Sequence, residues 1–166
     1  MFHSGKSLPE YLVYTFHQIR LFNPDVKVYF LTDSCLMQDE LFEKYNIITA
    51  NKDNYHSAKI KELEVLLKRK RDDFWTITAT RLIYIETFLK EHDLTDVYHF
   101  ENDVLLYHSL IVNHDKFCQF FKHIAITTAG EDKSMTGFMF IRNWQSLSLM
   151  TDFFISVLDT HGLRGA

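Results

Sequence analysis

The chain reads Val97-Tyr98-His99-Phe100-Glu101-Asn102-Asp103-Val104-Leu105-Leu106-Tyr107 at its most informative point. Apolar, β-branched and aromatic residues on both sides of the central triplet predict buried strand sequence. Two of the three interrupting residues, Glu101 and Asp103, are acidic, and unpaired acidic groups are unfavourable inside a core. The interruption therefore predicts either a functional site at the end of a strand or a solvated turn.

The spacing of these two carboxylates suits a divalent cation. Residues i and i+2 of a strand point to the same face, so Glu101 and Asp103 can both reach one hard ion, which prefers oxygen ligands. A Mn²⁺ or Mg²⁺ ion held there would neutralise a diphosphate and help it leave. From the residues alone, the metal site and the solvated turn stay equally open.

The flanking sequence alternates between helix and strand patterns. A strong helix is predicted at residues 74–90, where apolar residues recur at three-and-four spacing. The other predicted elements are a helix that begins at Ser7, helices at 36–45, 57–70 and 147–158, and strands at 26–31, 47–49, 97–100, 104–107, 124–128 and 136–141. This alternation predicts an α/β fold with a mixed, mainly parallel sheet flanked by helices. No linker is visible, so we expect residues 1–166 to form a single domain.

Composition narrows the classes of function. The 166 residues are 46% hydrophobic and carry a net charge of -4, which predicts no nucleic-acid partner and no binding to an anionic membrane. The basic run at residues 68–71 is interpreted as a solvated helix end. No apolar stretch approaches the roughly 20 residues that span a bilayer, and the chain does not begin with a signal-peptide pattern. We therefore expect no transmembrane segment and a cytoplasmic location.

The two cysteines predict no crosslink. Cys35 and Cys118 are far apart in the chain, and each lies in an apolar helical pattern. Free, buried thiols are the favoured interpretation. We expect no structural zinc site.

The order of these elements resembles a known enzyme family. The helix at 74–90, the strand at 97–100, the triplet Glu101-Asn102-Asp103 and the run at 104–107 are similar to the D-x-D segment of GT-A glycosyltransferases. The stretch from Leu8 to Asp33 resembles the first nucleotide-binding units of that family, and residues 136–143 resemble the strand after its metal motif. The resemblance extends over most of the chain.

This resemblance implies a Rossmann-like GT-A domain that binds a nucleoside-diphosphate sugar through Mn²⁺ or Mg²⁺. Such a domain transfers the sugar to an acceptor hydroxyl on a glycan, a lipid or a protein. The resemblance also implies that most of the first strand and the C-terminal acceptor half are missing. It identifies no catalytic base within the chain.

The resemblance assigns roles to individual residues. Asp103 would be the direct metal ligand, and Glu101 would bind the ribose or assist the metal through water. The Glu at the first motif position departs from D-x-D. The resemblance further places Asp33 at the nucleoside, Arg81 in the donor pocket, and Ser4 and Gly5 in the nucleotide pocket if Met1-Phe2 is the remnant of a first strand.

Alternatives accompany these assignments. Asp33 can instead be a helix cap or turn residue, and Arg81 can form a surface salt bridge. At the level of function, the alternatives are a non-catalytic sugar-nucleotide or partner-binding module on the same fold, and a metal-dependent phosphohydrolase with acidic groups at strand ends.

Overall fold

The computed structural model describes residues 1–68, 73–131 and 133–161, and within them the chain alternates between helices and strands. The helices are α1 (Leu12–Phe22), α2 (Glu40–Lys44), α3 (Ala58–Lys68), α4 (Asp73–Glu91), α5 (His114–Phe120) and α6 (Trp144–His161). The strands are β1 (Val28–Thr32), β2 (Ile47–Asn51), β3 (Val97–Phe100), β4 (Ile124–Thr128) and β5 (Ser134–Ile141). The α/β class predicted from the sequence is confirmed. The basic run continues from Lys68 into residues 69–71, which lie outside the described residues.

The strands form two small sheets. β1 and β2 pair in parallel, with Val28 opposite Ile47, whereas β5 lies between β3 and β4 and is antiparallel to both. The prediction of one mainly parallel sheet is therefore wrong for the C-terminal strands. β4 and β5 follow each other through a short loop, and a short connection between paired strands requires the antiparallel arrangement.

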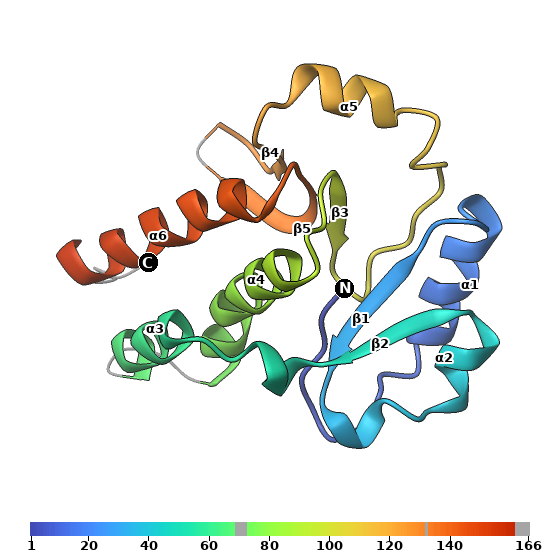
Figure 1. The fold of residues 1–166 in the computed structure, drawn as a ribbon, viewed down its shortest axis with the longest axis horizontal. Coiled ribbons are helices and arrows are strands. Elements are labelled where there is room, and N and C mark those ends of the chain that lie inside the picture. The colour runs from blue at the N-terminus through green and yellow to red at the C-terminus, as the bar shows by residue number, and fades with distance from the viewer. Residues whose placement is uncertain (69–72, 132, 162–166) are drawn as a thin grey trace.

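The first three residues run beside β1. Phe2 forms a parallel bridge with Leu31, and the backbone of His3 donates a hydrogen bond to the Leu31 carbonyl at 2.9 Å. Met1 lines a cavity together with the β3 residues Val97 to Phe100, so the N-terminal segment lies near both β1 and β3. Figure 1 shows the N-terminus at this central position.

The two sheets share two hydrophobic cores. Alternate residues of β1 point to opposite faces: Val28 and Phe30 pack in one core and Leu31 in the other. The first core contains side chains of α1 and α2, and the second contains side chains of α3, α4 and α6. Helices therefore cover both faces of the strands, as Figure 1 shows.

One predicted strand and the predicted start of the first helix differ from the structure. Residues 104–107 do not form a strand; Leu106 is buried, but Tyr107 is exposed. Val104 and Leu106 pack in a hydrophobic core, but residues 104–107 pair with no strand among the described residues. The first helix begins at Leu12 rather than near Ser7. The Leu12 N–H donates to the Pro9 carbonyl in a turn before the helix, and the carbonyl of Tyr11, at the N-cap, accepts the first helical hydrogen bond from Thr15.

Arg20 joins the end of α1 to the neighbouring loops. Its guanidinium donates to the carbonyls of Tyr45 and Asn46, each at 2.6 Å, and of Val26 at 2.7 Å. Five fixed donors in a planar fork allow one arginine to satisfy several carbonyls at once. Arg20 thus connects the end of α1 to the segments that lead into β1 and β2.

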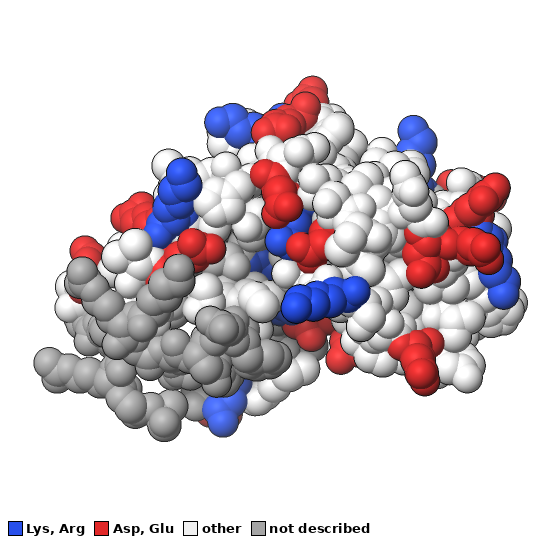
Figure 2. All heavy atoms as spheres, turned by 90° about the horizontal axis from the view of Figure 1, so that it is seen from below, with Lys and Arg blue, Asp and Glu red and all other residues white. Residues whose placement is uncertain are grey.

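The surface carries charges of both signs. On the face shown in Figure 2, acidic and basic side chains are interspersed over the described residues. Within these residues, no helix is both long enough and apolar enough to cross a membrane.

Candidate functional site

The acidic triplet forms a turn directly after β3. The backbone N–H of Glu101 donates to the Gly137 carbonyl at 2.9 Å and so continues the pairing with β5, while the Val104 N–H turns back to the Glu101 carbonyl at 3.1 Å. The chain therefore bends between the two acidic residues. A bend of this kind ends the strand where its side chains meet solvent.

Asn102, at the middle of the triplet, fixes the conformation of this turn. Its carbonyl accepts a hydrogen bond from the Thr15 hydroxyl at 2.9 Å, and its side-chain oxygen accepts one from the Tyr11 hydroxyl at 3.2 Å. The Asn102 amide nitrogen lies 3.3 Å from His3 Nδ1. Helix α1 and the N-terminal segment thus hold the turn from two directions.

A pocket of about 380 Å³ lies beside the turn. Its walls come from four parts of the chain: the N-terminal segment, Tyr11, helix α4 and the end of β3. The residues that matter for chemistry are Ser4, Arg81, His99, Glu101 and Asp103. The volume falls in the range of small-molecule sites. Two other cavities, of about 350 and 470 Å³, are lined mainly by apolar side chains and gather fewer charges.

Arg81 and Glu101 form an ion pair across this pocket. The same Arg81 nitrogen donates to the Thr136 hydroxyl on β5 at 2.6 Å. The Arg81 side chain is only 13% exposed, so the interpretation as a surface salt bridge is wrong. Arg81 does form a salt bridge, but it does so inside the pocket and with the first residue of the acidic motif.

Asp103 differs from Glu101 in its partners. It is exposed, and within the described part of the chain its carboxylate has neither an ion pair nor a hydrogen bond. Burial raises the pKa of the neighbouring Tyr11, and the charges of Asp103 and Glu101 raise it further. Tyr11 therefore stays a neutral hydroxyl near two carboxylates, and it donates its hydrogen bond to Asn102 rather than to Asp103.

Asp33 and Gly5 contact each other, but neither lines the pocket. The Gly5 N–H donates to one Asp33 oxygen at 2.9 Å, and Lys52 Nζ lies 3.1 Å from the other. Burial alone would raise the pKa of Asp33, but the Gly5 amide and Lys52 outweigh it and lower the pKa. Asp33 makes no side-chain cap to the short helix at Ser34–Leu36, so its observed role is to fasten the N-terminal loop.

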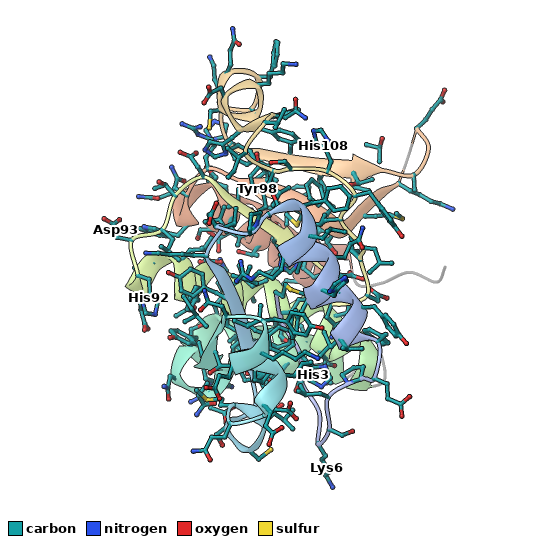
Figure 3. The ribbon with its side chains drawn as sticks, turned by 90° about the vertical axis from the view of Figure 1, so that its right-hand side faces the viewer. His3, Lys6, His92, Asp93, Tyr98 and His108 are labelled. Carbon is teal, nitrogen blue, oxygen red and sulfur yellow. The ribbon has the colours of Figure 1, made fainter. Side chains whose placement is uncertain are left out.

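The N-terminal loop presents Ser4 and His3 to the pocket. Figure 3 shows Lys6 at the outer tip of this loop, pointing away from the body of the molecule, with His3 closer to α1. His3 also contacts the Ser7 carbonyl through its other ring nitrogen, at 3.0 Å. The loop is thus tied to β1 through Asp33 and to the acidic turn through His3.

His99 also lines the pocket, although the sequence predicts only a packing or surface residue at this position. It is 2% exposed, and neither ring nitrogen has a hydrogen-bond partner among the described residues. Burial lowers the pKa of His99 well below its ordinary value, and the positive charges of the amino terminus and Arg81 lower it further. Its place on β3, two residues before the motif and on the same face as Glu101, was the available signal.

This buried histidine predicts a pH dependence of stability. Because the folded-state pKa is depressed, the unfolded chain takes up a proton below about pH 6.5 that the folded chain does not, so stability falls as pH falls. Between about pH 7.5 and about pH 5.5, the wild-type protein should lose about 1 kcal/mol more unfolding free energy than His99→Leu. Urea unfolding of both proteins in metal-free buffer measures the difference. Parallel pH profiles would show that His99 is not the buried neutral group described here.

No family model, curated protein or solved structure matches the chain. The chemistry that this site can support is therefore inferred from the residues of the pocket alone. Carboxylate oxygens from Asp103 and Glu101 are suited to a hard divalent ion, and a site with few protein ligands leaves coordination positions for a phosphate-containing ligand. Arg81 supplies a fixed positive charge on the opposite wall.

Proposed function

We propose that the chain binds a nucleoside-diphosphate sugar in the pocket beside the acidic turn, together with Mn²⁺ or Mg²⁺, and transfers the sugar to an acceptor hydroxyl. The observation that carries this proposal is the contrast between the two motif carboxylates. Asp103 is exposed and unpaired within the described residues, whereas Glu101 is neutralised by Arg81. A direct ligand must have free oxygens, so Asp103 is the metal ligand and Glu101 acts beside it.

The residues present fit such an ion. Asp103 offers carboxylate oxygens at the pocket wall, and the Glu101 carboxylate has a second oxygen besides the one that meets Arg81. When bound, a divalent ion would act as a Lewis acid that stabilises the departing diphosphate. Tyr11 and Asn102 hold the acidic turn in place, and the N-terminal loop with Ser4 closes the pocket from the other side.

Arg81 has a second role in this proposal. Its guanidinium lies on the pocket wall, and a guanidinium binds phosphate oxygens well. A diphosphate that enters the pocket would compete with Glu101 for Arg81. Release of Glu101 from the ion pair would then free it for the ribose or for a metal-bound water.

The location of the pocket supports the same function. Ligands of α/β proteins bind beyond the carboxyl ends of parallel strands. The pocket takes residues from the ends of β3 and of the N-terminal segment, which runs parallel to β1. The parallel pairing of β1 with β2, the parallel bridge of Phe2 with β1 and the antiparallel pairing of β3 with β5 are compatible with a GT-A domain.

Calorimetric titration of UDP and of GDP into the chain, with and without Mn²⁺, tests the proposal. We expect at least one nucleotide to bind more tightly with Mn²⁺ than without it. Binding that is equally tight in a metal-free buffer would favour a metal-independent nucleotide-binding module. Release of phosphate from simple esters without a nucleotide requirement would favour a phosphohydrolase.

A further inference from the structure

A second group of potential metal ligands lies away from the pocket. Asp96 precedes β3, and His114 and Cys118 lie on α5; one ligand atom from each residue comes within 4.8 Å of the others. All three side chains are half-buried, and Cys118 is a free thiol. Cys35 is exposed, so the expectation that both thiols are buried is wrong.

The helix supplies two of these ligands at a fixed spacing. His114 and Cys118 are four residues apart, which places them on one face of α5. His114 Nε2 lies 3.6 Å from Cys118 Sγ. Tetrahedral zinc, with Zn–S of about 2.3 Å and Zn–N of about 2.0 Å, separates such a sulfur and nitrogen by about 3.5 Å. The observed pair therefore already has the spacing of two zinc ligands.

The other nitrogen of His114 has a partner that orients the ring. His114 Nδ1 lies 3.3 Å from the hydroxyl of Tyr98, a half-buried residue of β3 that Figure 3 labels. The Tyr98 hydroxyl oxygen can accept a hydrogen bond from the Nδ1–H group, which leaves the lone pair of Nε2 facing Cys118. Metal-binding histidines are commonly oriented by a hydrogen bond of this kind.

Asp96 is oriented by the sheet. Its backbone N–H donates to the Arg142 carbonyl at 2.8 Å, and Arg142 Nη1 lies 2.8 Å from Asp96 Oδ1. Its φ of 56° is in the left-handed region, which few residues other than glycine adopt. Because Arg142 engages one oxygen, the carboxylate can turn its other oxygen toward His114 and Cys118.

Contrary to the expectation from the sequence that the chain has no zinc site, we propose that Asp96, His114 and Cys118 bind one Zn²⁺ or a similar thiophilic transition-metal ion, with water in the fourth position. The thiolate distinguishes this site from the pocket, where Asp103 and Glu101 offer only oxygen and so select harder ions. A metal bound here connects α5 to the start of β3, and through Arg142 to the end of β5. The site does not depend on the glycosyltransferase proposal.

Titration of the metal-free, reduced chain with Co²⁺ tests this site, because a thiolate ligand gives a charge-transfer band and tetrahedral Co²⁺ gives intense visible bands. We expect both bands to saturate at one equivalent and to disappear when Zn²⁺ displaces Co²⁺. Cys118→Ser should abolish the charge-transfer band, and His114→Ala should weaken Co²⁺ binding at least about tenfold. Circular dichroism confirms that each variant is folded.

Two variants serve as controls. Cys35→Ser removes the exposed thiol, and Asp103→Asn removes the proposed ligand in the pocket; both should keep the Co²⁺ bands of the wild type. A wild-type chain without a charge-transfer band would overturn the proposal. A band that persists in Cys118→Ser, or one that Cys35→Ser removes, would also overturn it.

Discussion

Asp103→Asn is expected to lower the affinity for UDP or GDP in Mn²⁺ by about 100-fold, which corresponds to about 2.7 kcal/mol. The substitution keeps the size of the side chain but removes the charge that holds the cation between protein and diphosphate. Asp103 has no ion pair or side-chain hydrogen bond among the described residues, so the fold should be unaffected. Nucleotide binding without metal should be the same in wild type and variant.

Isothermal titration calorimetry with a matched control measures this effect. Asp115 is an exposed aspartate on α5, outside the pocket, so Asp115→Asn carries the same change of charge and should retain wild-type affinity. If Asp103→Asn and Asp115→Asn bind nucleotide equally well in Mn²⁺, Asp103 is not the metal ligand.

Arg20→Ala is expected to lower the free energy of unfolding by roughly 2–4 kcal/mol. Three carbonyls, of Val26, Tyr45 and Asn46, lose a charged donor at 2.6–2.7 Å, and a hydrogen bond to a charged group contributes about 1.5–3 kcal/mol. The three contributions are not additive because water replaces part of the lost bonding. Lysine cannot reproduce the planar fork, so Arg20→Lys should recover only part of the loss.

Urea denaturation followed by circular dichroism gives the comparison for Arg20. Lys27, close by in the sequence, is exposed, and Lys27→Ala should change stability by no more than about 0.5 kcal/mol. Equal midpoints for Arg20→Ala and Lys27→Ala would mean that the Arg20 contacts do not stabilise the fold.

The sequence was sufficient to predict the class of fold and most of its elements. Apolar spacing predicted α4, and runs of β-branched and aromatic residues predicted β1, β3 and β5. Strand pairing could not be predicted in the same way, because partner choice depends on contacts between distant residues. Residues 104–107 illustrate the limit: Val104 and Leu106 contribute to a core, yet these residues pair with none of the strands in the described part of the chain.

The sequence predicted only those residues of the candidate site that stand out in the local sequence pattern. Glu101 and Asp103 were singled out because they interrupt apolar sequence. Arg81 was singled out only by the family resemblance, and it lines the same pocket as these two residues. The contact between Gly5 and Asp33 joins residues 28 positions apart in sequence, which no local pattern reveals. His114 and Cys118 did carry a local signal in their four-residue spacing, but Asp96 joins them only in the folded chain.

Diffraction from a crystal of the chain soaked with a nucleotide that binds in the titration and with Mn²⁺ tests the central proposal most directly. We expect an anomalous manganese peak at coordinating distance from the Asp103 carboxylate, bridging it to the diphosphate. Clear nucleotide density without a manganese peak at Asp103, or with the nucleotide bound outside this pocket, would contradict the proposed function.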